Sequence, residues 1–237
     1  MASSTHVEIG DARLREGRID IYRRVLDILF SAVLLLLALP VIALVSMGSA
    51  VSLRAWPYFS QYRVGRDGQL FRFIKVRTLP ADHDAYTDKH HLEQDRIPSF
   101  CRVVRALHLD ELPQLVLVLF GKMSLVGPRP EMEHLHGAMA PGFAELRTSV
   151  RPGCTGVWQV SESSVELIGA APEYDRFYLA NRTVRLDLWI LFRTGLHMLG
   201  LGKPITLADV PEWTRRRSAG SAPVADPAIS LPVTAGR

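Results

Sequence analysis

Residues 28–53 read ILFSAVLLLLALPVIALVSMGSAVSL, and not one of these 26 side chains is charged. A membrane-spanning helix needs roughly 20 consecutive apolar residues, so the stretch is long enough to enter a bilayer. A soluble helix of this length with no charged face would be unusual, because its outer side must meet water. A cleaved signal peptide fits less well, since its apolar region covers only about 7–15 residues. The stretch therefore predicts a membrane helix.

Pro40 lies in the middle of this stretch, where a proline removes a backbone donor and kinks or breaks a helix. Both flanks are basic and carry Arg23 and Arg24 on one side and Arg54, Arg63 and Arg66 on the other. Under the positive-inside rule, both ends then favour the cytoplasmic side. These residues alone are compatible with a straight span and with a re-entrant helix that enters and leaves on the same face.

The amino-acid composition argues against several classes of protein. With 48% hydrophobic residues among 237, the chain has enough apolar material for a core and is not disordered throughout. Its two cysteines, Cys101 and Cys154, form no C-x-x-C pair, which argues against a disulfide framework and a zinc knuckle. The net charge of +4 is too small to indicate nucleic-acid binding. All of it falls in residues 28–130, which hold twelve basic and eight acidic side chains.

The region after the membrane helix has the mixed composition of a globular domain. Residues 70–78 alternate as a strand and follow a turn signal at 65–68, so the segment around 58–78 predicts a β-hairpin. Lys75 and Arg77 share one face of that strand. Residues 181–201 predict an amphipathic helix, of the kind that lies on a membrane surface or packs on a domain.

These patterns divide the chain into four parts. The ends are polar or rich in Ala, Pro and Ser, and both are predicted to be disordered. In order, the parts are a disordered N-terminus (1–18), a membrane helix (19–53), a globular domain (54–213) and a disordered tail (214–237).

Asp110 and Glu111, in the sequence LDELPQ over 109–114, are the strongest candidates for chemistry, because the usual nucleotide-binding and hydrolase motifs are absent. Most adjacent carboxylates are only the solvated start of a helix, and Asp110 would suit the N-cap with Pro113 in the first turn. The same place would let a phosphate approach Asp110 while Glu111 holds a divalent cation.

Arg129 is the second candidate, because the prolines of Gly127–Pro130 restrict the backbone around its guanidinium. As an isolated tetrapeptide this is only a turn. Lys75 and Arg77 form either a salt-bridged surface or a clamp for phosphate.

Three other groups have simpler explanations. The acidic and histidine-rich loop between Asp82 and Asp95 is predicted to be a solvated surface. Glu131 could add to a cation site, whereas a surface helix start better explains Glu133, His134 and His136. We expect Cys154 and Trp158 to be core residues.

Six sequence blocks together resemble the bacterial sugar transferases, that is, the monotopic polyprenyl-phosphate phosphoglycosyl transferases. The resemblance runs from about Tyr22 to Leu199, most of the chain, and each block alone is weak. The blocks are RRVLDILFS, QYRVGRDGQLFRFIKVRT, LDELPQL, GKMSLVGPRPE, RPGCTGVWQV and EYDRFYLANRTVRLDLWIL.

The resemblance implies a role for each matching residue. Asp110 would be the nucleophile that attacks the sugar-bearing phosphorus of a UDP-sugar, so that UMP leaves and an aspartyl phosphosugar forms. A polyprenyl phosphate would then accept the sugar phosphate, and Glu111 would bind Mg²⁺. Substrate and phosphate binding would fall to Lys75, Arg77, Gln114, Arg129 and Arg151. Pro40 matches the helix break of the family and favours the re-entrant form.

The family also implies an architecture and a location. We expect an α+β, mostly helical monotopic enzyme with a proline-broken re-entrant helix, a short hairpin and interfacial amphipathic helices. It would lie in the bacterial inner membrane with its catalytic domain on the cytoplasmic face and begin the synthesis of an exopolysaccharide, O-antigen, capsule or glycoconjugate. Its partners would be membrane lipids, the two substrates and, as a further candidate, a second copy of the chain, but no nucleic acid.

One departure affects the expected sugar specificity: Ser161–Ser163 reads SES where the family usually has SGR. Two alternative functions stay open. The first is an inactive membrane anchor that recruits other pathway enzymes, although the intact Asp110, Glu111, Lys75 and Arg129 argue against decay. The second is a metal-dependent phosphatase or nucleotidyl enzyme, which would have no use for a membrane helix beside its site.

Overall fold

The computed structural model describes residues 2–82 and 97–216, with side chains described from Asp20 onward. These residues are mostly helical with two small sheets, in agreement with the predicted α+β class. The helices are α1 (Ala2–Leu53), α2 (Ser99–Ala106), α3 (Gln114–Leu119), α4 (Glu133–Gly137), α5 (Pro141–Thr148), α6 (Pro172–Ala180) and α7 (Val184–Met198). The strands are β1 (Tyr58–Val64), β2 (Leu70–Val76), β3 (Ser124–Val126) and β4 (Gly153–Thr155).

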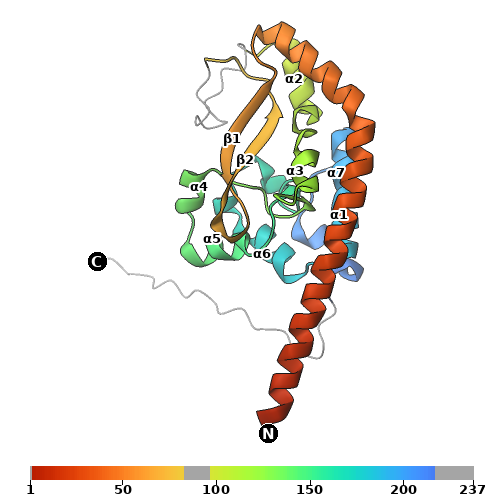
Figure 1. Cartoon of the computed structure of the whole chain (residues 1–237), viewed down its shortest axis with the longest axis vertical. Coiled ribbons are helices and arrows are strands. Elements are labelled where there is room, and N and C mark those ends of the chain that lie inside the picture. The colour runs from red at the N-terminus through yellow and green to blue at the C-terminus, as the bar shows by residue number, and fades with distance from the viewer. Residues whose placement is uncertain (1, 83–96, 217–237) are drawn as a thin grey trace, which may run out of the picture.

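Helix α1 is continuous from Ala2 to Leu53, which corrects the prediction of a helix broken at Pro40, and it includes residues 2–18, for which disorder was predicted. From Ala2 the chain extends the membrane helix, because adding residues to an existing helix costs less than nucleating a new one. Pro40 lies inside α1 without ending it, and Figure 1 shows that the helix bends in its orange C-terminal part. A proline can bend a helix in this way because it removes one hydrogen bond while the neighbouring bonds remain.

Most of the apolar surface of α1 is left uncovered by the domain. The segment Asp20–Leu53 is long and apolar enough to cross a membrane, with a mean hydropathy of 3.0 in an 18-residue window of which only 17% is buried. Leu36 and Leu37 expose 69% and 68% of their surface. An apolar surface of this extent is unfavourable in water, so the helix needs an apolar partner such as lipid.

Polar side chains near the start of the apolar stretch attach α1 to the domain. Arg23 forms an ion pair with Asp187 of α7, with 2.5 Å between Nη2 and Oδ2. The carboxylate of Asp27 accepts hydrogen bonds from the hydroxyl of Ser124 at 2.8 Å and from the backbone N–H of Leu125 at 3.0 Å. These contacts satisfy charges that lie beside an apolar helix, and they fix α1 relative to β3 and α7.

The predicted hairpin is confirmed. Strands β1 and β2 pair antiparallel, with Tyr58 opposite Val76 and Val64 opposite Leu70. Phe71 and Phe73, which share one face of β2, are buried in the main core, and Val76 on the other face is buried in a second cluster with Val45 and Val104.

A second sheet was not predicted. Strands β3 and β4 pair in parallel, with Ser124 beside Gly153 and Val126 beside Thr155. Their backbones come so close that a Cβ on Gly153 would lie 2.1 Å from the nitrogen of Gly127. This close approach needs glycine and sets the position of the turn that follows β3. Strands of three residues show no recognisable alternation, so sequence patterns could not have found them.

The predicted amphipathic helix is present as α7. The hydroxyl of Thr183 caps it by accepting a hydrogen bond from the N–H of Leu186 at 3.1 Å. Leu186 and Ile190 are fully buried in the main core, together with Trp158, which confirms Trp158 as a core residue. Phe192, on the other side of α7, is 63% exposed.

The ordered domain extends slightly beyond the predicted boundary at residue 213. Thr214 is fully buried, and its carbonyl accepts a hydrogen bond from the hydroxyl of Thr183 at 2.5 Å. The guanidinium of Arg215 lies 5.5 Å from the ring centre of Phe177. The predicted disordered tail otherwise falls in 217–237, and the acidic loop falls almost entirely in 83–96, both outside the described residues.

Candidate active site

A large cavity lies between α1, the β1–β2 hairpin and α7. Its volume is about 1220 Å³, larger than typical small-molecule sites. One part of its wall is apolar and comes from α1 and α7: Phe30, Leu34, Leu37, Val41, Leu188 and Leu191. The opposite part carries most of the predicted site residues: Lys75, Arg77, Asp110, Glu111, Gln114 and Arg129. The cavity can therefore hold an apolar chain and an anionic group at the same time.

Asp110 lies in a helical turn, Leu109–Glu111, between α2 and α3. It is not the N-cap of α3, as one interpretation of the sequence held, because Pro113 occupies that position. Its side chain borders the cavity, yet the residue is only 5% exposed. Burial, followed by the neighbouring charge of Glu111, raises the pKa of Asp110 to about 6. At neutral pH the carboxylate is therefore mainly ionised but poorly solvated, as a nucleophile should be.

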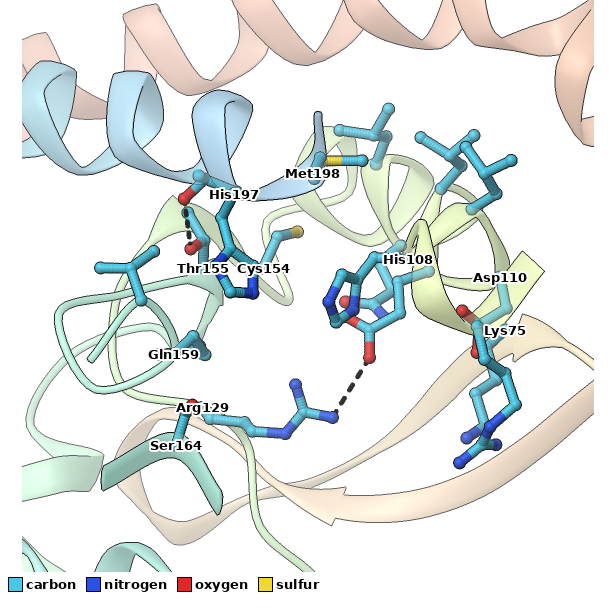
Figure 2. A pocket seen from close by; sticks show the side chains of 18 of the residues that line it. Lys75, His108, Asp110, Arg129, Cys154, Thr155, Gln159, Ser164, His197 and Met198 are labelled. Atoms are coloured by element: carbon cyan, nitrogen blue, oxygen red, sulfur yellow. Dashed lines mark hydrogen bonds and ion pairs between the residues drawn. The ribbon is translucent and has the colours of Figure 1, made fainter. Parts of the chain in front are cut away.

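Glu111 forms an ion pair with Arg129, with 3.2 Å between Oε1 and Nη2. The dashed line that starts at Arg129 in Figure 2 marks this interaction. Burial by itself would raise the pKa of Glu111, but the charges of Arg129 and Lys75 outweigh it and lower that pKa to about 2. Two neighbouring carboxyl groups thus have pKa values that are pushed apart, a pattern typical of active sites.

A buried ion pair positions the backbone of Arg129. Arg147 of α5 donates from Nη2 to the carbonyl oxygen of Arg129 at 2.7 Å. The same guanidinium donates from Nε to Asp175 of α6 at 2.7 Å, and the two side chains are only 4% and 3% exposed. No sequence motif had pointed to this pair, whose members are 28 residues apart.

Lys75 and Arg77 lie close to the aromatic ring of Phe59 on β1. The Nζ atom of Lys75 is 5.5 Å from the ring centre and the guanidinium carbon of Arg77 is 5.8 Å from it. Burial is the largest influence on the pKa of Lys75 and lowers it to about 8, although the charges of Asp110 and Glu111 oppose this change. Both side chains line the cavity, a position that suits the predicted clamp for phosphate, and the choice between that clamp and a salt-bridged surface stays a prediction.

Arg151 does not join this group. Its Nε atom donates to the carbonyl oxygen of Gly121 at 2.9 Å. It borders a separate, small cavity of about 30 Å³ together with Arg24, Asp27 and Arg66. The prediction that Arg151 binds the phosphates of the same substrate is therefore not supported by its position. Ser124 and Val126 of β3 border this small cavity, whereas Leu125 borders the large one, so the two cavities lie on opposite faces of the strand.

Several lining residues escaped the sequence interpretation. Arg63, Arg105, His108, Gln159, Ser164 and His197 all border the cavity. His108 precedes the LDELPQ block directly and could have been noticed, whereas His197 lies at the end of α7 with no local signal. Their rings lie 6.1 Å apart between centres.

The acidic and histidine residues that follow the GPRP turn differ in how far they are exposed. Glu131 is buried, borders the cavity and lies 3.8 Å from Arg63. Glu133 and His134 are exposed at the start of α4, as expected for a surface helix start. Glu162, in the SES segment, is exposed and does not line the cavity. The cavity is bordered instead by Ser164 and Glu166, which follow that segment.

Magnesium binding at this cavity stays a prediction, which the types of residue present can be compared with. Among the described residues no group of three or more His, Cys, Asp or Glu side chains could hold a metal ion. Mg²⁺ at phosphate-transfer sites is usually bound by one or two carboxylates plus substrate phosphates, so a complete protein cage is not required. Glu111 and Asp110 supply hard oxygen donors, and the lowered pKa of Glu111 keeps it ionised.

Comparison with known proteins agrees with this geometry. The family model for bacterial sugar transferase matches residues 19–200. The exopolysaccharide production protein ExoY of Sinorhizobium fredii is 33% identical over 73% of this chain and 84% of its own length. The UDP-glucose:undecaprenyl-phosphate glucose-1-phosphate transferase of Caulobacter vibrioides is 34% identical over 74% and 69%, respectively. A protein of the same name from Klebsiella pneumoniae is 30% identical, but the match spans only 39% of its length. The chain therefore belongs to the bacterial sugar transferase family.

Proposed function

We propose that this chain transfers a sugar phosphate from a UDP-sugar to an undecaprenyl-type polyprenyl phosphate, as an early step of exopolysaccharide synthesis. One observation carries the proposal: the buried carboxylate of Asp110 faces a cavity that combines cationic side chains with an apolar wall from the membrane helix. The names of the relatives from Caulobacter and Klebsiella, which specify UDP-glucose and undecaprenyl phosphate, support the substrate classes.

In the proposed reaction, a carboxylate oxygen of Asp110 attacks the phosphorus that carries the sugar. The bond from this phosphorus to the bridging oxygen breaks, UMP leaves with the electron pair, and an aspartyl phosphosugar remains. A phosphate oxygen of the polyprenyl carrier then attacks the same phosphorus and releases the carboxylate. The products are a polyprenyl diphosphate sugar and the regenerated enzyme.

The other charged residues stabilise negative charge during both steps. Lys75 and Arg129 flank the carboxylates and can contact the diphosphate oxygens, which costs little reorganisation because both are already in the cavity. Arg77 and Gln114 border the same space. A magnesium ion held by Glu111 would supply further neutralisation of the diphosphate charge.

The assay for this function is UMP release from a panel of UDP-sugars, with and without polyprenyl phosphate. We expect release with at least one donor, dependence on Mg²⁺ and loss of release in EDTA. Absence of release across the panel would contradict the proposal and favour an inactive anchor. Phosphate release from simple phosphate esters would instead favour a phosphatase.

We also propose that α1 enters the cytoplasmic face of the inner membrane and returns to it. The bend in α1, the uncovered apolar surface and the basic residues at both ends support this placement. Single cysteines are introduced near the N-terminus or near the C-terminus. A membrane-impermeant maleimide added to intact cells should label neither of them. Labelling of the N-terminal cysteine alone would show that the helix spans the membrane.

The pH dependence of kcat/KM is expected to be bell-shaped, with limbs near pH 6 and pH 8. Below about pH 6, Asp110 is protonated and cannot attack, so activity rises as the pH increases through this value. Above about pH 8, Lys75 loses its charge and the diphosphate loses a cation, so activity falls.

Lys75→Arg tests the assignment of the alkaline limb, because arginine stays charged far above pH 8. The variant should lose the alkaline limb and keep the acidic one. Lys122→Arg is the matched control, since Lys122 is exposed and outside the cavity lining. An alkaline limb that persists in Lys75→Arg would assign it to another group.

A further inference from the structure

The cavity has a charged side and a neutral polar side. Figure 2 shows Lys75 and Asp110 on one side and Gln159 and Ser164 on the other, with Arg129 between them. All five residues line the same cavity. The charged side suits the phosphates of a nucleotide sugar, and the neutral side has the chemistry to bind uncharged polar groups.

Gln159 presents both ends of a buried amide without a partner. Neither its Nε2 nor its Oε1 atom has a hydrogen-bond partner among the described residues, and both atoms are inaccessible to solvent. This conclusion does not depend on which terminal atom is nitrogen, because both lack a partner. Buried polar groups are nearly always hydrogen-bonded in native proteins, so an amide of this kind needs an explanation.

The backbone beside Gln159 is shaped to accommodate this amide. A Cβ on Gly156 would lie 2.7 Å from Oε1 of Gln159 and 2.4 Å from the carbonyl oxygen of Gly127. Only glycine at residue 156 leaves room for the side chain in this position. The amide therefore lies close to the backbone beside the GPRP turn that also carries Arg129.

A second amide, whose nitrogen atom lacks a partner among the described residues, borders the cavity. Gln114 is 2% exposed, and its Nε2 atom has no partner among residues 20–82 and 97–216. It follows the carboxylate turn in the sequence and begins α3. Gln61 provides a contrast on the same cavity, because its Nε2 atom donates to the sulfur of Met132 at 3.0 Å.

We propose that Gln159, assisted by Gln114, forms a subsite that hydrogen-bonds the uncharged part of the donor substrate. This inference rests on the proposed function and adds how the donor is recognised. A glutamine amide offers one acceptor and two donors, which complement either neighbouring hydroxyl groups of the sugar or the imide edge of uracil. Both ends of the Gln159 amide are covered in the free protein, so this side chain turns toward the cavity when the donor binds. The bond to the donor then satisfies atoms that the free protein leaves unpaired, which makes the amide suited to select the donor.

The test is Gln159→Met, measured in a protein that also carries Asp110→Asn so that no covalent intermediate forms. Methionine keeps the length of the side chain and removes its hydrogen-bonding atoms. The dissociation constants of UDP-glucose, UDP-galactose and UMP are measured by calorimetry, and thermal stability is measured without ligand. We expect at least one UDP-sugar to bind about ten-fold more weakly, while thermal stability is unchanged or higher because an unpaired buried amide has been removed.

The three ligands show whether Gln159 binds the sugar or the uracil of the donor. Weaker binding of the UDP-sugars with unchanged binding of UMP places the sugar at Gln159, and equally weaker binding of all three places the uridine there. Unchanged binding of all three would overturn the inference and leave the proposed function intact. If the Asp110→Asn protein binds none of the three, the donor class itself is wrong and both proposals fail.

Gln61→Met is the matched control, because it makes the same change at a cavity glutamine that already has a partner. It should lower thermal stability and leave the ratio of UDP-sugar to UMP affinity unchanged. A change in that ratio as large as that of Gln159→Met would show a general disturbance of the cavity and overturn the inference.

Discussion

Asp110→Asn is expected to lower the rate of UMP release by at least about 10³-fold, because an amide cannot replace the carboxylate as nucleophile. The protein should still fold, since asparagine has nearly the same shape and removes a charge whose burial already raises the pKa of Asp110 to about 6. Steady-state UMP release measures the first effect. Mass spectrometry of the intact protein with UDP-sugar should detect a phosphosugar adduct in the native chain and none in the variant.

Asp67→Asn is the matched control for this substitution. Asp67 is exposed in the turn between β1 and β2, and its backbone has a φ of 56°, which asparagine tolerates well. This variant should keep native activity. Native rates in Asp110→Asn, or an adduct that persists in it, would remove Asp110 from the role of nucleophile.

Asp175→Ala is expected to lower the free energy of unfolding by about 3–5 kcal/mol, because it leaves Arg147 buried without its charge partner. The two side chains are only 3% and 4% exposed, so water cannot compensate. Thermal unfolding in detergent measures this loss. UMP release should fall as well, since Arg147 also holds the carbonyl oxygen of Arg129.

Replacing both members separates the structural effect from the effect on catalysis. The double variant Arg147→Met and Asp175→Leu removes both charges and should recover much of the lost stability. Its kcat should stay reduced with little change in KM for the acceptor, because the backbone of Arg129 has lost its donor. Recovery of both stability and kcat would show that Arg147 has a structural role alone.

Part of the site could be predicted from sequence and part could not. Lys75, Asp110, Glu111, Gln114 and Arg129 are brought to one cavity, as the matching family blocks imply. Arg151 also matched a block, but its side chain lies at a different cavity. A motif specifies the local backbone, whereas the direction of a side chain relative to a distant element depends on how those elements pack.

The sequence by itself determined the elements whose cause is local. The uncharged stretch over 28–53 predicts a long apolar helix, and alternating residues around a glycine turn predict the hairpin. Only the tertiary structure decided that α1 passes through Pro40 without a break, that β3 and β4 pair, and that Gln159 and Asp110 border one cavity. The physical reason is that these features arise from contacts between distant segments, whose energies leave no period or spacing in the sequence.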